Sequence, residues 1–124
     1  MWHDTASPHI RHRPENRGTV AELNGEIDIA TGPGVSEALG DLTRTWHPQL
    51  IIDLRPVTFT DSTVLHLLLR TRTRVLDRHG VLHLVSTGRL LPRMLLATGL
   101  DRTFPLHRTL HDTPPFPSPT SDER

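Results

Sequence analysis

Two short apolar runs, separated by a helical pattern, limit the possible folds of this chain more than any other feature. Residues 50–54 and 81–85 consist mainly of Leu, Ile and Val, which is typical of strands covered on both faces of a parallel sheet. Between and beside these runs, apolar residues recur at helical spacing over stretches of about 10–18 residues. Strands that alternate with helices require crossover connections, so the sequence predicts an α/β fold.

The predicted order of elements is β-β-α-β-α-β-α-β, in a mostly parallel or mixed sheet of about four to five strands. The first two strands are expected to form a hairpin, because only a short turn around residues 14–18 separates them. The last strand contains Pro105, which suits the edge of a sheet. The expected strands are 9–13, 19–25, 50–54, 81–85 and 103–106, and the expected helices are 31–47, 62–79 and 90–98.

The helical stripes predict which side chains enter the core. In the first helix, Trp46 continues the stripe that begins at Val35, and in the second helix Leu76 is expected to face inward. The outer face of the second helix is expected to be solvated, because it carries a series of arginines at positions 70, 72, 74 and 78.

The length of 124 residues fits one domain. Residues 1–8 are polar and are expected to form a flexible N-terminus, and residues 9–111 are expected to form the α/β domain. Residues 112–124 are rich in Pro and Ser, a composition that does not build a core. They are expected to form a disordered tail.

Composition argues against several classes of function. The formal net charge is zero, and there are only three Phe and two Trp, so neither a basic surface nor an aromatic platform for nucleic acid is expected. Without Cys there is no disulfide and no thiolate nucleophile. No apolar run approaches the roughly 20 residues that span a bilayer, and the N-terminus does not resemble a signal peptide. A cytoplasmic protein without a membrane partner is expected.

The stretch 57–65 is the most informative for function. A short β-type run ends at Asp61-Ser62-Thr63, and a Leu-rich helical pattern follows at once. A Ser hydroxyl at such a helix start either caps the helix or accepts a phosphate, because unpaired N–H groups and the helix dipole favour negative charge there. In a parallel sheet the loop at residues 25–28 ends at the same edge, so Asp28 and Asp61 are expected to flank Ser62.

Three segments together resemble the STAS domain family and, within it, the bacterial anti-sigma factor antagonists. They are Gly25-Glu26-Ile27-Asp28, Ile51-Ile52-Asp53-Leu54 and Phe59-Thr60-Asp61-Ser62-Thr63. The resemblance covers residues 9–108, including the turn Gly99-Leu100-Asp101 after the third helix. It implies a single STAS-like domain in a non-enzymatic regulator, with no catalytic residue and no cofactor.

The resemblance also implies how such a protein is switched. Ser62, which follows the Asp, is the implied phosphoacceptor, and Thr63 is the second choice. The unphosphorylated protein binds an anti-sigma factor that is itself a serine kinase, and a sigma factor is thereby freed. Phosphorylation ends this binding, and a phosphatase resets the protein. The implied partner-binding residues are Glu26, Asp28, Asp61, Ser62, Thr63 and Val64.

One residue departs from the family pattern, because Val64 stands where the family usually has Gly. Its stiff, branched side chain either fills a gap in the core or blocks the close approach of a kinase. A STAS scaffold that is never phosphorylated is therefore the first alternative. A ligand-sensing accessory subunit of a transport system is the second.

Other polar residues are interpreted as structural. Asp53 lies inside an apolar run and is expected to bond backbone groups or an Arg. The nine His residues are scattered, with no His-x-x-x-His or His-Glu-x-x-His pair on a predicted helix, so no metal site is expected. The Asp61–Ser62 pair has no positioned His and no Gly-x-Ser-x-Gly motif, which argues against a hydrolase.

Overall fold

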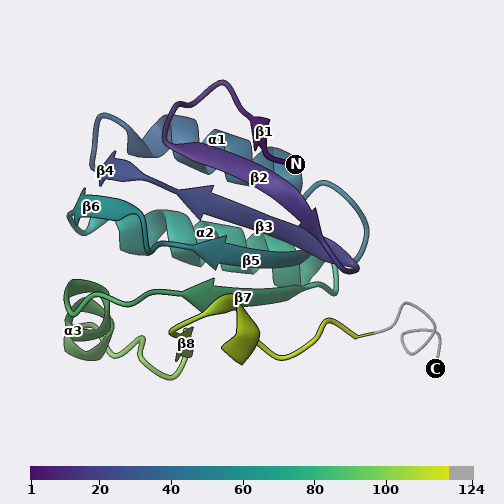
Figure 1. Cartoon of the computed structure of the whole chain (residues 1–124). Helices are drawn as coiled ribbons and strands as arrows, with labels where there is room; N and C mark the ends of the chain where they lie inside the picture. The colour runs from purple at the N-terminus through teal and green to yellow at the C-terminus, as the bar shows by residue number, and fades with distance from the viewer. Residues whose placement is uncertain (118–124) are drawn as a thin grey trace.

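The computed structural model describes residues 1–117, and within them a six-stranded mixed sheet forms the centre of the molecule (Figure 1). Its strand order is β1-β2-β3-β5-β7-β8. The first three strands pair in antiparallel fashion, and β3, β5, β7 and β8 run parallel to one another. The bounds are β1 (His3–Asp4), β2 (Ile10–Glu15), β3 (Gly18–Leu23), β5 (Gln49–Asp53), β7 (Val81–Val85) and β8 (Leu106–His107). The predicted α/β class is confirmed.

The helices cover one face of this sheet. Figure 1 shows α1 (Gly32–Leu42) and α2 (Thr63–Asp77) side by side behind the strands. Alternate residues of the strands point toward these helices, and the resulting core includes Leu23, Ile52 and Leu84 from the sheet and Leu39 and Leu68 from the helices, each at most 1% exposed. The third helix, α3 (Leu90–Ala97), adds Leu91 and Leu95 to the same core, and a short 3-10 helix, η1 (Leu110–Asp112), follows β8.

A second, two-stranded sheet projects beyond the main one. Gly25 adopts a positive φ of 74°, which turns the chain out of β3 and into β4 (Gly25–Ile27). This strand pairs in parallel with β6 (Val57–Thr60), and both lie at one end of the molecule (Figure 1). The sequence predicted a β-type run at residues 57–60 but not this pairing.

Two predicted core positions are wrong. The first helix ends at Leu42 and not at His47, because the Thr43 hydroxyl donates a hydrogen bond to the carbonyl of Gly40 at 2.9 Å and the chain turns away. Trp46 is consequently 63% exposed. In α2, Leu76 is 47% exposed, because the core position in the last turn is taken by its neighbour Val75, which is fully buried. The last strand also begins later than predicted, at Leu106, while Phe104 is buried in the core.

Both chain ends carry more structure than the sequence predicted. His3–Asp4 within the supposedly flexible N-terminus forms β1 and pairs with β2. At the other end, Phe116 is only 8% exposed and packs on the sheet face opposite the helices, against Val20, Ile51 and Val85. Phe116 thus covers an apolar patch of the sheet that would otherwise face water. The remaining tail, residues 118–124, lies outside the described residues.

Candidate functional site at the start of α2

The pairing of β4 with β6 brings together the two loops that the sequence singled out. Ile27 pairs with Thr60 in the parallel register, so the next residues along the chain, Asp28 and Asp61, leave neighbouring strands at the same edge. The Thr60 hydroxyl also donates a hydrogen bond to the carbonyl of Ile27 at 3.0 Å. This bond ties the two loops to each other and fixes their relative position.

The first turns of α1 and α2 meet at the same corner. A Cβ atom on Gly32 would lie only 2.5 Å from Cγ2 of Thr63, so the Thr63 methyl group packs directly onto the α1 backbone. Only Gly at position 32 permits this approach. The N-terminal ends of two helices, each with unpaired backbone N–H groups, therefore lie beside the Asp28 and Asp61 loops.

Asp61 supplies the hydrogen bond that caps α2. Its Oδ1 accepts a hydrogen bond from the backbone N–H of Thr63 at 2.8 Å. Hydrogen bonds from the side chain and the backbone of Thr63 lower the pKa of Asp61 below its usual value. The carboxylate is therefore charged at neutral pH, beside the start of the helix.

Ser62 occupies the N-cap position but does not act as a cap. Its backbone angles are already helical, at φ −63° and ψ −12°, and its side chain makes no capping hydrogen bond. The residue is exposed, and within residues 1–117 its hydroxyl has no hydrogen-bond partner. Thr63, in contrast, is half-buried because its methyl group packs on Gly32. The Ser62 hydroxyl is thus the more accessible of the two candidate acceptors.

Asp28 makes the local turn bonds that are usual for a loop Asp. Its Oδ1 accepts hydrogen bonds from the backbone N–H groups of Ala30 at 2.9 Å and Thr31 at 3.1 Å. The Thr31 hydroxyl in turn donates to the carbonyl of Glu26 at 2.7 Å. Asp28 therefore holds its own loop in shape and is half-buried, while Glu26 is exposed.

Val64 does not belong to the surface. Its side chain is fully buried, at 0% exposure, and forms part of the core. The prediction that Val64 is a partner-binding side chain is therefore corrected, since the start of α2 turns it inward. Of the two roles that the sequence left open, the structure shows the first, in which the branched side chain fills core space.

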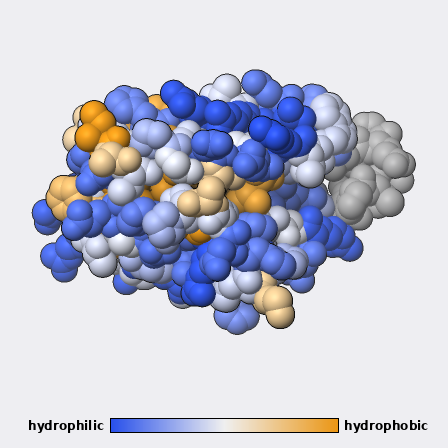
Figure 2. Space-filling model, turned by 90° about the horizontal axis from the view of Figure 1, so that it is seen from above, coloured by the Kyte–Doolittle hydropathy of each residue, from blue (hydrophilic) through white to orange (hydrophobic). Residues whose placement is uncertain are grey.

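Two exposed apolar residues at the same corner were missed by the sequence analysis. Ile29 is 82% exposed and Phe59 is 52% exposed. Figure 2 shows strongly hydrophobic surface at the end of the molecule where β4 and β6 lie. Ile29 stands between Asp28 and Ala30 in a loop, and this position is the one signal in the sequence that pointed to it. Such apolar surface beside charged groups is typical of protein docking sites.

We call this surface the Ser62 face. Its members come from the β4–α1 loop, from β6 and from the start of α2. They are Glu26, Asp28, Ile29, Phe59, Asp61 and Ser62.

Asp53 has the structural role that the sequence predicted. It is 3% exposed, and the Arg55 side chain donates two hydrogen bonds to its carboxylate, from Nε to Oδ1 at 3.0 Å and from Nη2 to Oδ2 at 2.8 Å. The backbone N–H of Arg55 donates a third, also to Oδ1. The hydrogen bond to Asp53 raises the pKa of Arg55. This pair fixes the end of β5 and leaves Asp53 unavailable for other chemistry.

The described residues offer no metal centre and no membrane-spanning helix. Across residues 1–117, no three side chains of His, Asp or Glu are grouped so that they could hold a metal ion. None of the helices in this part of the chain has the length and the apolar character needed to cross a bilayer.

Comparisons with known proteins agree with this geometry. The family model of the STAS domain matches residues 7–113. RsfB, an anti-sigma-F factor antagonist of Mycobacterium tuberculosis, is 35% identical over 99 residues, which cover 78% of this chain and 79% of RsfB. The crystal structure of an anti-sigma factor antagonist from Mycobacterium paratuberculosis has a TM-score of 0.75 at 34% identity and covers 83% of this chain and 87% of that one.

A more distant structure shows the same fold. It is an anti-sigma-factor antagonist (STAS) domain protein from Planctomyces limnophilus, with a TM-score of 0.75 at 22% identity, and the match covers 83% of this chain and 92% of that one. The chain therefore belongs to the STAS domain family. Within this family it is an anti-sigma factor antagonist, similar to RsfB. Antagonists of this kind are regulators and not enzymes, as the sequence predicted.

Proposed function

We propose that the Ser62 face binds an anti-sigma factor of the serine-kinase type and that phosphorylation of Ser62 ends this binding. In the unphosphorylated state the protein occupies the anti-sigma factor and so frees a sigma factor. A phosphatase then restores the binding form. The observation that supports this proposal most directly is the exposed hydroxyl of Ser62, which has no capping role because Asp61 accepts the Thr63 N–H.

Electrostatics explains how one phosphate switches the face. A phosphoserine adds a charge of about −1.5 to −2 at neutral pH and a bulky hydrated group. It stands next to the charged Asp61 and close to the loop of Asp28, so it raises the negative charge of a surface that is already acidic. A loss of about 3 kcal/mol in binding free energy lowers affinity by about two decades. No refolding of the domain is required.

Apolar contacts are expected to supply most of the affinity for the partner, and the phosphate on Ser62 lowers that affinity. Phe59 in β6 pairs with Glu26 in β4, and Ile29 follows β4 by two residues. The exposed side chains of Phe59 and Ile29 lose water when a partner covers them. Acidic residues at the rim then select a partner with complementary positive charge. The Ser62 face thus combines two exposed apolar side chains that bind the partner with surrounding acidic residues whose charge affects that binding.

A phosphorylation assay tests the acceptor. The full chain is incubated with its cognate anti-sigma factor kinase and ATP, and the product is mapped by mass spectrometry. We expect one phosphate, on Ser62, and none on a Ser62→Ala variant. Thr63→Val is the matched control, because it keeps the methyl group that packs on Gly32 and removes only the hydroxyl. Full phosphorylation of Ser62→Ala, or none of the unaltered chain, would contradict the proposal.

The first alternative is a STAS scaffold that is not phosphorylated. Val64 at the usual Gly position pointed to it, but this side chain is buried and does not lie on the surface that a kinase would approach. In such a scaffold, the affinity for the partner does not depend on the charge at position 62. Equal affinity of Ser62→Ala and Ser62→Asp for the same partner supports the scaffold, whereas much weaker binding of Ser62→Asp supports the switch.

A further inference from the structure

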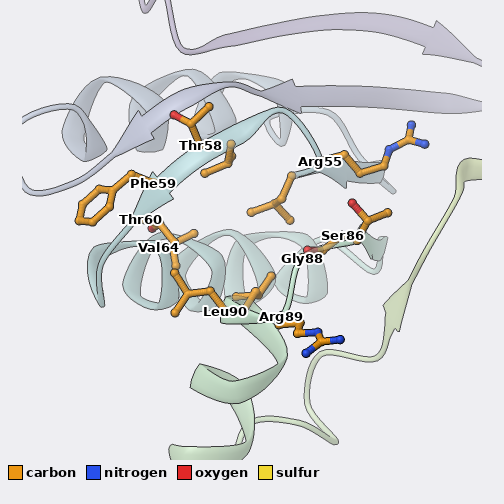
Figure 3. Close-up of a pocket in the computed structure, with 13 residues that line it drawn as sticks. Arg55, Thr58, Phe59, Thr60, Val64, Ser86, Gly88, Arg89 and Leu90 are labelled. Carbon is orange, nitrogen blue, oxygen red and sulfur yellow. The ribbon is translucent and has the colours of Figure 1, made fainter.

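A cavity of about 270 Å³ lies beneath the strand that leads to Ser62. It opens to solvent and is lined by β6, by Leu54 and Arg55 after β5, and by the Ser86–Arg89 loop that leads into α3 (Figure 3). Crevices at the carboxyl ends of parallel strands are the usual place for ligands in α/β proteins. The cavity wall and the Ser62 face share one residue, Phe59, whereas Glu26, Asp28, Ile29, Asp61 and Ser62 do not line the cavity.

The cavity is divided into an apolar part and a polar part. Figure 3 shows Phe59, Val64 and Leu90 toward one side, and Ser86 with the side chains of Arg55 and Arg89 toward the other. Leu54, Val57 and Leu91 add further apolar wall. A ligand that fills both parts has an apolar tail and a polar head.

Charge determines the kind of head group. The cavity is lined by two arginines and by no Asp or Glu side chain, and all of its lining residues lie within residues 1–117. The Arg55 charge is balanced by its hydrogen-bonded pair with Asp53. Arg89 is exposed, makes no side-chain cap bond at the start of α3 and has no ion pair within the described chain. The polar part therefore carries about one uncompensated positive charge, which suits a monoanion.

We propose that this cavity binds a small amphipathic anion, such as a short- or medium-chain carboxylate. The carboxylate contacts Arg89 and the hydroxyl groups of Ser86 and Thr87, and the alkyl chain lies between β6 and the start of α3. The cavity is slightly smaller than the roughly 300–1,000 Å³ of sites for drug-sized ligands, so the chain of the ligand is short. Ser62 itself does not line the cavity and makes no contact with the ligand.

An NMR titration of the ¹⁵N-labelled full chain tests the proposal with three probes: octanoate, 1-octanol and inorganic phosphate. We expect octanoate to cause saturable shifts confined to the cavity lining, including the amides of Thr58, Thr87 and Gly88. We expect 1-octanol, which keeps the tail and lacks the charge, to bind about tenfold more weakly, because a charge-assisted hydrogen bond is lost. Phosphate, which lacks the tail, is expected to cause no saturable shifts there.

Two variants complete the test. Arg89→Ala is expected to weaken octanoate binding about tenfold and to leave the affinity for 1-octanol unchanged. Arg93→Ala is the matched control, because Arg93 is an exposed arginine of the same helix that does not line the cavity. The proposal is overturned if octanoate and 1-octanol bind equally well, if phosphate saturates the same amides, if both arginine variants weaken binding alike, or if octanoate shifts nothing in the lining.

Discussion

The carboxylate of Asp61 accepts a hydrogen bond from the backbone N–H of Thr63 at 2.8 Å, whereas Ser62, the residue between them, takes no part in this bond. Capping is thereby the task of Asp61, and the regulation that we propose falls to the adjacent Ser62. Asp61 stabilises the start of α2, and Ser62 is left accessible. Substitutions at positions 61 and 62 separate these two tasks.

Asp61→Ala is expected to lower the midpoint of denaturation, because a capping acceptor is removed, whereas Asp61→Asn retains an acceptor and is expected to lower it less. Ser62→Ala is the matched control and is expected to leave the midpoint unchanged, since its hydroxyl caps nothing. Urea unfolding monitored by circular dichroism measures all three. A larger loss in Ser62→Ala than in Asp61→Ala would contradict the assignment of the cap.

The stabilising effect of Asp61 depends on pH in a defined direction. The folded-state pKa of Asp61 is lowered, so its charged form is favoured by folding. Its contribution is complete above the unfolded pKa of about 3.9 and is lost as pH falls through the folded pKa. The difference in stability between the unaltered chain and Asp61→Ala should therefore shrink as pH falls below about 4. A difference that grows on acidification would contradict this sign.

A second pH dependence of stability comes from His83, on the sheet face opposite the helices. Burial, together with nearby His107, lowers the pKa of His83, whose ring stacks on Phe116 at a centroid distance of 6.0 Å. The unfolded chain takes up this proton near pH 6.5, and the folded chain does so only at lower pH, so stability falls as pH drops below about 6.5. In the His83→Gln variant, the free energy of unfolding should change less between about pH 7.5 and about pH 5, a range that brackets the unfolded-state His pKa of about 6.5. His66→Gln, at an exposed position on α2, should not reduce this change.

Two phenylalanines of opposite burial provide a matched pair. Phe116→Ala is expected to lower the free energy of unfolding by about 3 kcal/mol, since it removes a buried ring that packs on the sheet face opposite the helices. Phe59→Ala removes a ring that is 52% exposed, and it is expected to change stability by less than about 0.5 kcal/mol. The affinity for the partner should be lower in Phe59→Ala than in Phe116→Ala, which is the reverse of the order expected for the loss of stability. Loss of stability in Phe59→Ala alone would contradict the assignment of the two rings.

The Val64→Gly variant tests the departure from the family pattern. It removes a fully buried side chain and places Gly in a helix, so we expect a loss of about 2–4 kcal/mol in stability. Because Val64 is buried, the surface presented to a kinase is unchanged, and the rate of Ser62 phosphorylation should change little at a temperature where both chains are folded. A strong increase in that rate would show that Val64 restricts access to the kinase.

Periodicity and turn chemistry predicted the elements that depend on local sequence. The runs at 50–54 and 81–85 became β5 and β7 within one residue, because a buried parallel strand is apolar throughout. Contacts between distant segments were not predictable in this way. Nothing local indicates that β4 pairs with β6, and therefore the exposure of Ile29 and Phe59 at one corner was missed.

Single residues in polar surroundings were misjudged for the same reason. Phe116 stands among prolines in a segment of low hydrophobicity, and only the apolar patch of Val20, Ile51 and Val85 makes its burial favourable. Trp46 fits a helical period, but the turn that follows Thr43 ends the helix before it. In each case a tertiary contact or a turn overrode the local pattern.

The proposed switch depends on the charge at the Ser62 side chain, which changes the affinity for the anti-sigma factor. The full chain is prepared with serine or with phosphoserine incorporated at position 62, and the affinity of each form for the anti-sigma factor is measured by calorimetry. We predict that the phosphorylated form binds about 100-fold more weakly, which corresponds to about 3 kcal/mol. Equal affinity of the two forms would contradict the switch.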